Sequence, residues 1–285
     1  MKQGKEFLFM LLALLMILST FSTQKCTKAN ITALPWFSGY ETGDYSEWDE
    51  TRVGSGYRTL DNGTTIFVQN ELKIVDTPTH HGQYASYHKS YGDFMNYQGV
   101  NTSIVFLAPS WPYVSLPSLS HVYVGWYQYF ANVPNWTDYK IRHPDKDWAL
   151  NVRTMALYAN VGEIVRVYLK VPEWEPHPML AHLYYWDGRL TQTATRFQFF
   201  PHIWYYFLYE FDATTGTHRL YISAPPYNVS TPIIELVGMN TTGVKVTGLT
   251  VGQFEADFYD AESYTDCITV AEKFIYVHIP RKLQC

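Results

Sequence analysis

Charged side chains are scarce in this sequence. Lys, Arg, Asp and Glu together make up 16% of the 285 residues, and the net charge is −5. Basic residues form no run beyond short clusters such as Arg281-Lys282. Duplex nucleic acid requires a basic patch that neutralises phosphates. The composition therefore argues against nucleic acid as a partner.

Cysteine is also rare, and the motifs of several enzyme classes are missing. The cysteines are Cys26, Cys267 and Cys285, without a C-x-x-C pair or the His/Cys spacing of a zinc site. One disulfide between the N-terminal and C-terminal segments is expected, with one thiol left over, and the pairing stays open. The sequence contains no nucleophile elbow and no phosphate-binding glycine loop, so we expect no organic cofactor.

Long hydrophobic runs are limited to one, at the N-terminus. Phe7–Leu18 is an unbroken apolar stretch that follows Lys2 and Lys5. It is too short to span a bilayer comfortably and fits the hydrophobic region of a signal peptide. Residues 1–22 are therefore expected to be a signal peptide or, alternatively, an uncleaved N-terminal anchor, which is the only expected membrane contact.

Six N-x-S/T sequons support export. So many acceptor sites in a chain with an export signal indicate a glycosylated protein that is secreted or lies at the cell surface. The sequons begin at Asn30, Asn62, Asn101, Asn135, Asn228 and Asn240.

The pattern of apolar residues predicts strands. Short alternating or continuous apolar runs are separated by Gly, Pro, Asn and Asp, which favours an antiparallel β-sandwich. We expect Trp48, Phe207, Tyr209 and Phe211 in its core. The expected strands are Thr65–Gln69, Glu71–Val75, Tyr84–His88, Val122–Phe130, Ala149–Tyr158, Ile164–Val171, Leu183–Trp186, Trp204–Asp212, His218–Ile222, Lys245–Gly252 and Ile268–Val277.

Five motifs in order resemble the concanavalin A-like lectin/glucanase superfamily. They are an opening strand, a His-Gly turn, a Val-Tyr-Val strand, a Trp-Tyr hairpin around Thr-Gly, and a closing Tyr-x-Asp strand. In this sequence they correspond to Tyr40–Trp48, His80–Ala85, Val122–Pro134, Trp204–Ser223 and Tyr264–Ile268, where Cys267 replaces the second Asp of the last motif.

The resemblance implies a single all-β jelly roll of the laminin-G-like or carbohydrate-binding-module type, which the polysaccharide-lyase jelly rolls also share. We assign residues 23–35 to a short N-terminal segment, 36–280 to the jelly-roll domain and 281–285 to a C-terminal tail. The superfamily contains lectins, lyases, hydrolases and adhesion modules, so the fold alone does not give the function.

The resemblance also implies a structural calcium site. In carbohydrate-binding modules of this shape, the opening-strand Glu and the closing-strand Asp often share one Ca²⁺, a cation that prefers carboxylate and carbonyl oxygens. Glu41 and Asp266 occupy the matching positions, with Asp44 nearby. The alternative is that these residues are ordinary surface carboxylates.

Catalytic motifs of the superfamily are incomplete. The segment from Glu255 to Asp260 copies the spacing of laminarinase-type carboxylates but ends in Asp and resembles a loop. Alginate and heparin lyases use Tyr and His to move protons and Arg, Lys or Gln to neutralise a uronate. The composition permits this chemistry, but the alginate-lyase motifs are absent.

A sugar-binding surface is the remaining candidate. Tyr rings stack on sugars, whereas Arg and Glu hydrogen-bond to hydroxyl groups, and alternation within the strands places such residues on shared faces. Alternatively, these rings only cover the outside of the sandwich. The candidates for the concave sheet are Tyr123, Tyr127, Tyr129, Arg166, Tyr168, Tyr206 and Glu210.

We therefore expect a non-catalytic glycan-binding module that takes a glycan or polysaccharide as its partner. A polysaccharide lyase or glycoside hydrolase is the first alternative, and a structural envelope or surface protein is the second. The sequence does not identify the sugar or the oligomeric state.

Overall fold

The computed structural model describes residue 31 and residues 33–59, 62–91, 96–97, 100–101, 110–132, 150–171, 179–257 and 261–274. All regular secondary-structure elements in these ranges are β-strands, and all strand pairs are antiparallel. Within the same ranges, no helix is long and apolar enough to cross a membrane.

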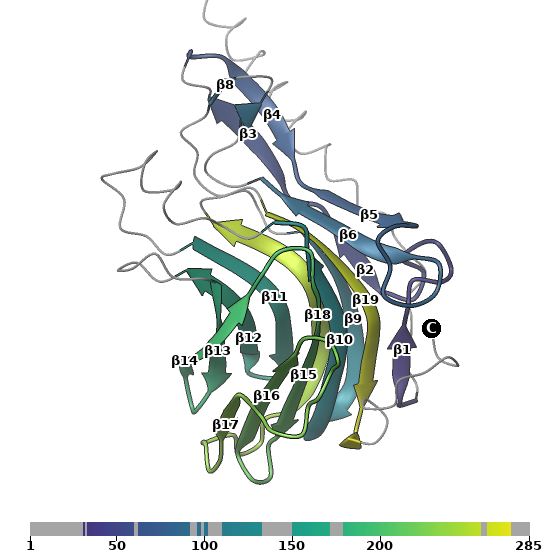
Figure 1. Cartoon of the computed structure of the whole chain (residues 1–285). Helices are drawn as coiled ribbons and strands as arrows, with labels where there is room; N and C mark the ends of the chain where they lie inside the picture. The colour runs from purple at the N-terminus through teal and green to yellow at the C-terminus, as the bar shows by residue number, and fades with distance from the viewer. Residues whose placement is uncertain are drawn as a thin grey trace, which may run out of the picture.

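Two large sheets form the body of the molecule (Figure 1). Sheet A has eight strands, and its order places sequence-distant segments side by side. The order is β17 (Ile234–Leu236), β16 (Thr217–Ser223), β15 (Trp204–Asp212), β10 (His121–Phe130), β19 (Ala261–Ala271), β6 (Ala85–Ser90) and β5 (Glu71–Val75), with β1 (Trp36–Ser38) also paired to β19.

Sheet B has seven strands and faces sheet A across the core. Its order is β14 (Leu190–Phe199), β13 (Met179–Trp186), β12 (Gly162–Val171), β11 (Leu150–Ala159), β18 (Val246–Asp257), β9 (Trp111–Leu119) and β2 (Glu50–Arg52). The two sheets make an antiparallel β-sandwich, so the expected fold class is confirmed.

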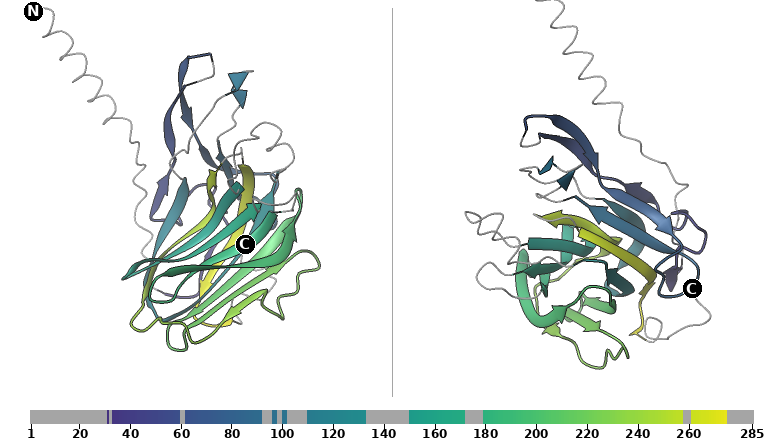
Figure 2. Two further views of the ribbon diagram at one scale, coloured as in Figure 1. Left: turned by 90° about the vertical axis from the view of Figure 1, so that its left-hand side faces the viewer. Right: turned by 45° about the horizontal axis from the view of Figure 1, so that its top comes forward.

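Two small ribbons accompany the sandwich. One pairs β3 (Ser55–Thr59) with β4 (Thr65–Gln69), and the other pairs β7 (Asn96–Tyr97) with β8 (Val100–Asn101). Figures 1 and 2 show the first ribbon extending away from the main sheets. Its outer face carries Tyr57 and Phe67, which are 65% and 46% exposed and directly opposed in register.

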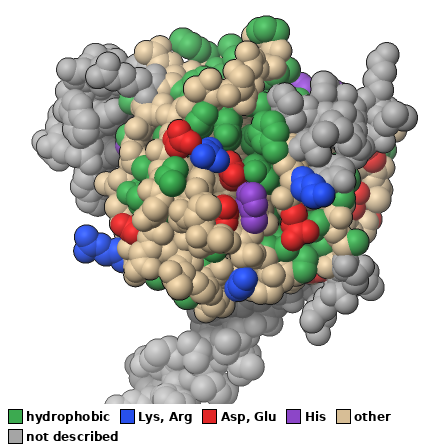
Figure 3. Space-filling model, turned by 90° about the horizontal axis from the view of Figure 1, so that it is seen from below, with side chains coloured by type: hydrophobic (Ala, Val, Ile, Leu, Met, Phe, Trp, Pro, Cys, Tyr) green, Lys and Arg blue, Asp and Glu red, His purple; other side chains and the backbone are tan. Residues whose placement is uncertain are grey.

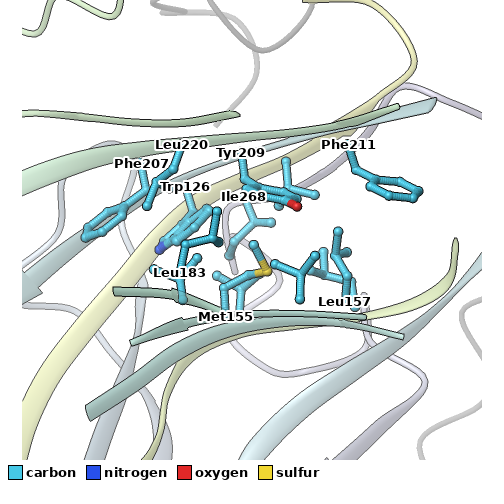
Figure 4. Packing of buried hydrophobic residues seen from close by; sticks show 14 of the residues in the cluster. Trp126, Met155, Leu157, Leu183, Phe207, Tyr209, Phe211, Leu220 and Ile268 are labelled. Atoms are coloured by element: carbon cyan, nitrogen blue, oxygen red, sulfur yellow. The ribbon is translucent and has the colours of Figure 1, made fainter. Parts of the chain in front are cut away.

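The core lies between the inner faces of the two sheets (Figure 4). Sheet A contributes Trp126, Phe207 and Ile268, and sheet B contributes Met155 and Leu183. The rings of Trp126 and Phe207 stack at a centroid distance of 4.9 Å. Because strand residues alternate between faces, the inward-facing side chains of β10 and β15, such as Trp126 and Phe207, come from every second position.

The four predicted core residues are all fully buried. Trp48, Phe207, Tyr209 and Phe211 each have 0% exposure. The predicted hairpin is also confirmed, because β15 and β16 pair around the turn that contains Gly216. Gly216 has φ +63°, and a Cβ there would lie 2.2 Å from the carbonyl oxygen of Met239. Only glycine fits this turn without displacement of the backbone.

The last two strands differ from the predicted ones. β19 begins at Ala261, seven residues before the expected start at Ile268, and ends at Ala271. Its first half has Ser263 and Thr265 on the inner face, fully buried, so the expected apolar pattern is absent there. Glu255 and Asp257 lie on strand β18. The sequence predicted a loop at these positions, and that prediction is wrong.

Candidate functional site

The predicted sugar-binding residues divide between two sheets. Tyr123, Tyr127 and Tyr129 lie on β10, and Tyr206 and Glu210 lie on β15, all on the outer face of sheet A. Their strand neighbours Val122, Val124, Phe207 and Phe211 point into the core.

Arg166 and Tyr168 instead lie on β12 of sheet B, where Val165, Val167 and Leu169 point into the core. They therefore face away from sheet A on the opposite side of the sandwich. The sequence predicted one surface that combines Arg166 and Tyr168 with the residues of β10 and β15, and this prediction is wrong. Alternation within a strand shows which side chains share a face, but it does not show to which sheet the strand belongs.

Glu210 is held in a network of cations and hydroxyl groups. Its carboxylate accepts hydrogen bonds from Tyr123 Oη at 2.9 Å and from Arg219 Nη1 at 3.0 Å, and it lies 3.3 Å from His121 Nε2. Arg219 Nε also donates to Glu235 at 2.7 Å. Glu210 is only 6% exposed. These contacts give Glu210 and Tyr123 a structural role at this end of sheet A.

A histidine–tyrosine cluster lies farther along the same face. The His80 ring stacks on Tyr127 at 3.7 Å, and its Nε2 is 3.1 Å from Tyr227 Oη. Tyr127 also contacts Tyr206, with the ring centroids 4.8 Å apart. Burial, together with the nearby His81, lowers the pKa of His80 to about 3. His80 is therefore neutral at physiological pH.

Asp266 lies beneath this cluster and is fully buried. Its Oδ2 accepts the backbone N–H groups of His80 at 2.8 Å and His81 at 2.9 Å, and its Oδ1 accepts that of Cys267 at 2.7 Å. Burial raises the pKa of Asp266 to about 7. The side chain thus fixes the loop that carries both histidines onto β19.

The other two expected calcium ligands are exposed and separately bonded. Glu41 accepts the backbone N–H groups of Gln83 and Tyr84 at 2.9 and 3.2 Å. Asp44 Oδ1 accepts the backbone N–H group of Ser46 at 2.9 Å.

These carboxylates do not form the oxygen cage that Ca²⁺ requires, because they face N–H donors. In the described part of the chain, no group of three or more His, Cys, Asp or Glu residues is arranged to hold a metal ion. Glu41 nevertheless lies near enough to Asp266 to contribute to its raised pKa, and the calcium site stays a prediction.

The outer face of sheet B carries a connected set of polar and aromatic side chains, here called the outer lattice. Each member contacts at least one other member or is its direct neighbour in the strand register. The outer lattice consists of Arg153 on β11, Glu163, Arg166, Tyr168 and Lys170 on β12, and His182 and Tyr184 on β13.

Hydrogen bonds hold the outer lattice in place. Arg153 Nε donates to Tyr168 Oη at 2.9 Å, and Lys170 Nζ donates to Tyr184 Oη at 2.6 Å. Arg166 binds Glu163 through Nε and Nη2, at 2.5 and 2.9 Å. Lys170 Nζ also lies 4.9 Å from the centroid of the Tyr184 ring. The cationic groups are therefore positioned before any ligand arrives.

His182 is the unusual member of the outer lattice. It lies next to Tyr168 in the register, and its Nε2 is buried without a hydrogen-bond partner. Burial, with a further contribution from Lys170, lowers the pKa of His182 to about 4. A neutral imidazole with an unpaired nitrogen can accept or donate one proton.

Sequence reasoning missed five members of the outer lattice. Arg153, Glu163, Lys170, His182 and Tyr184 were not among the predicted ligand residues. Alternation alone placed Arg166 and Tyr168 on one face, and the same alternation places Lys170 with them. His182 and Tyr184 required knowledge that β13 pairs with β12 in this register.

The described sequon residues are accessible. Asn62, Asn228 and Asn240 are exposed. Asn101 lies on β8, and nothing is described of its side chain. Asn30 and Asn135 lie outside the described residues. Cys267 forms a disulfide, and the other two cysteines lie outside the described residues as well.

The charges on the underside of the molecule are mixed (Figure 3). Among the described residues visible in that view, acidic and basic side chains alternate with hydrophobic ones and form no patch of one sign.

No family model matches the chain, and no curated protein matches it. Several solved structures are similar. Domain 4 of AbnA, a GH43 extracellular arabinanase from Geobacillus stearothermophilus in complex with arabinotriose, is 12% identical with a TM-score of 0.43, over 83% of this chain and 90% of that one.

The alginate lyase from Klebsiella pneumoniae is 8% identical with a TM-score of 0.43, over 83% of this chain and 98% of that one. The exoplasmic/lumenal domain of VIP36, in a Ca²⁺/Man-bound form, is 9% identical with a TM-score of 0.37, over 70% and 86%. Because identities and scores are low, function is argued below from this chain's own residues.

Proposed function

We propose that this protein is a secreted or cell-surface module that binds acidic glycans on the outer lattice of sheet B. The observation that carries the proposal is the pre-positioned group of Arg153, Arg166 and Lys170 around the rings of Tyr168 and Tyr184. Binding sites combine such fixed polar groups with apolar ring surface.

Charge selects the class of glycan. The described side chains of the outer lattice include three cations, Arg153, Arg166 and Lys170, and one carboxylate, Glu163. Glu255 on β18 is the register partner of Arg153, and nothing is described of its side chain. The guanidinium group of Arg153 matches a carboxylate or sulfate in shape and charge. Uronate or sulfated sugars therefore fit better than neutral ones.

Burial of the charged groups increases their effect. The side chains of Arg153 and Arg166 are 13% and 29% exposed. Charges that are partly removed from water are screened less by salt and solvent than exposed ones. Because hydrogen bonds already order them, less side-chain entropy is lost when a ligand binds.

One observation favours a second candidate function, a polysaccharide lyase. A lyase removes the proton at C5 of a uronate, breaks the C4–O glycosidic bond, forms a C4=C5 double bond and protonates the leaving oxygen. His182 is the candidate base, Tyr168 the candidate acid and Arg153 the candidate group that neutralises the uronate. Because Nε2 of His182 is buried, the base role requires the ring to become exposed when substrate binds. Each residue is thus a candidate for one role.

Titration with acidic and neutral oligosaccharides tests the proposal. We expect the exported chain to bind oligosaccharides of polygalacturonate, alginate or heparin, and the affinity to fall as salt rises. Lys170→Gln, which removes a lattice charge, should weaken binding about tenfold. The matched control is Lys73→Gln on sheet A, whose side chain is 54% exposed and should be dispensable.

Absence of binding to every acidic oligosaccharide, or equal loss in both Lys variants, would contradict the proposal. Incubation with the same polymers separates the two candidates. Ultraviolet absorbance from an unsaturated uronate that appears with wild type and disappears in His182→Ala would assign a lyase. Binding without product supports the non-catalytic module.

A further inference from the structure

The outer face of sheet A carries a continuous transverse row of side chains, here called the aromatic row. Each member is the direct register partner of the next, on five consecutive strands. Lys73 on β5 pairs with Tyr87 on β6, Tyr87 with Tyr264 on β19, Tyr264 with Tyr129 on β10, and Tyr129 with Trp204 on β15.

The rings of the aromatic row touch one another. The centroid distances are 5.1 Å from Tyr87 to Tyr264, 5.7 Å from Tyr264 to Tyr129 and 5.5 Å from Tyr129 to Trp204. Lys73 Nζ lies 4.6 Å from the centroid of Tyr87. Tyr87 is nearly buried at 7%, whereas Tyr264, Tyr129 and Trp204 remain partly exposed. The row therefore presents a surface to solvent and is not part of the core.

Positive and negative charges beside the aromatic row balance each other. Its only cation, Lys73, is paired with Glu71 at 2.8 Å. Glu262 lies beside the row, where it accepts a hydrogen bond from Tyr264 Oη at 3.4 Å. Lys89 lies between Glu71 and Glu262 in the strand register, so these described groups hold two carboxylates and two ammonium groups. The local charge is balanced, which favours a neutral ligand over a charged one.

The geometry of the row restricts the ligand further. Neighbouring strands lie about 4.8 Å apart, so the rings repeat at about that interval perpendicular to the strands. An extended chain of pyranose units repeats at a comparable length. Adjacent rings are inclined to one another by 50° to 74°, so the sugars stack on the faces of some rings and contact the edges of others. A compact or branched ligand would not contact several rings that lie in a straight row.

We propose that the aromatic row is a second binding site, which takes an extended neutral polysaccharide lying across the strands of sheet A. It goes beyond the proposed function, because it uses the opposite face of the sandwich and a ligand of different charge. Tyr264, Tyr129 and Trp204 supply the stacking surface, and the phenol groups supply hydrogen bonds to sugar hydroxyls.

A depletion assay with insoluble cellulose, xylan and chitin tests this site. Wild type should bind at least one of them with little dependence on salt. Trp204→Ala and Tyr264→Ala should each weaken that binding about tenfold, the size of effect seen when one stacking ring is removed. Trp204→Phe and Tyr264→Phe, which keep a ring, should bind within about threefold of wild type.

Melting temperatures of the same variants report folding, and two separate positions keep the test valid if one variant fails to fold. Lys170→Gln on the outer lattice should not change binding to the neutral polymers. The proposal is overturned if wild type binds none of the three polymers, or if folded Trp204→Ala and Tyr264→Ala bind like wild type. Neither result affects binding of acidic oligosaccharides to sheet B, so the two proposals fail separately.

Discussion

Tyr209 and His218 form a buried hydrogen-bonded pair between β15 and β16, with the phenol oxygen 2.6 Å from Nδ1 of the imidazole. The opposite nitrogen of His218, Nε2, lies 3.1 Å from the carbonyl oxygen of Trp186 at the end of β13. Trp186 belongs to sheet B, so this imidazole links the two sheets through the core.

This link predicts acid sensitivity. Burial lowers the pKa of His218 to about 4, so the unfolded chain binds a proton more readily than the folded one. The stabilisation is complete above about pH 6.5, the ordinary histidine value, and is lost as the pH falls toward 4. Between pH 7 and pH 5 the loss from His218 is about 2 kcal/mol.

Urea unfolding at pH 7 and pH 5 measures this effect. His218→Asn should be less stable than wild type at pH 7 but should lose less stability on acidification. His80 and His182 act in the same direction, so part of the wild-type loss will remain. An unchanged pH dependence in the variant would exclude His218 as a source.

Asp266 predicts an opposite pH dependence. Because burial raises its pKa to about 7, the folded state binds this proton more tightly than the unfolded state. Its contribution is therefore lost as the pH rises from about 4 to about 7. The unfolding free energy of Asp266→Asn, measured relative to wild type, should increase over this interval. A constant difference would contradict the buried-acid assignment.

The same variant tests the calcium expectation. A Ca²⁺ ion on Asp266 would stabilise the folded state by about 2.7 kcal/mol at a hundredfold excess over Kd. Chelation should then lower the melting temperature of wild type and leave Asp266→Asn unchanged. If wild type has the same melting temperature with chelator and with calcium, Asp266 binds no Ca²⁺ and only accepts its three backbone N–H groups.

Two glycines form a matched pair for a packing test. Gly252 and Gly162 have similar φ values of +108° and +103°. A Cβ at Gly252 would lie 2.4 Å from Cε1 of His88, whereas a Cβ at Gly162 meets nothing within 4 Å. Both alanine variants experience the same backbone strain, but Gly252→Ala must also displace the His88 ring. It should cost about 1–3 kcal/mol more than Gly162→Ala by chemical denaturation.

Removal of the Lys170 charge has a consequence that requires no ligand. Lys170 is one cause of the low pKa of His182, after burial. Lys170→Gln should therefore raise the pKa of His182, as observed by NMR titration of the ring protons. Lys73→Gln on the other sheet should leave that pKa unchanged. If Lys170→Gln does not move it, the ammonium group and the imidazole are not coupled.

Glycosylation is expected at the exposed sequons. Asn62, Asn228 and Asn240 have accessible side chains, so enzymatic deglycosylation of the exported protein should reduce its mass. Replacing each Asn by Gln should remove one step of that reduction. If the exported protein has the mass of the unmodified chain, the three sequons are not glycosylated.

The sequence predicted individual strands better than their pairing. β4, β5 and β15 have the predicted bounds because each is a short, mainly apolar run that ends at or next to Asn or Asp. β14 was missed, since its edge position leaves Thr, Gln and Ala where a central strand carries large apolar residues. β9 was missed because Pro112 and Pro117 interrupt the pattern.

The candidate sites depended on information that is not local. Alternation identified the outward face of each strand, including Tyr129 on β10 and Tyr168 on β12. It did not show that Tyr264 and Trp204 are register partners of Tyr129 on either side. Register between strands more than a hundred residues apart is set by the packing of the whole sandwich.

The pairing of β1 with β19 has a mechanical consequence. Trp36, at the start of β1, lies opposite Val270, near the end of β19, and Ser38 lies opposite Ile268. When the chain is pulled from the residues before Trp36 and from the residues after Ala271, both forces act at the same end of this antiparallel pair. The hydrogen bonds are then loaded one at a time and not together. Once the disulfide of Cys267 is reduced, tension should first peel β1 away at low force, while β10 still shields β19 on its other edge.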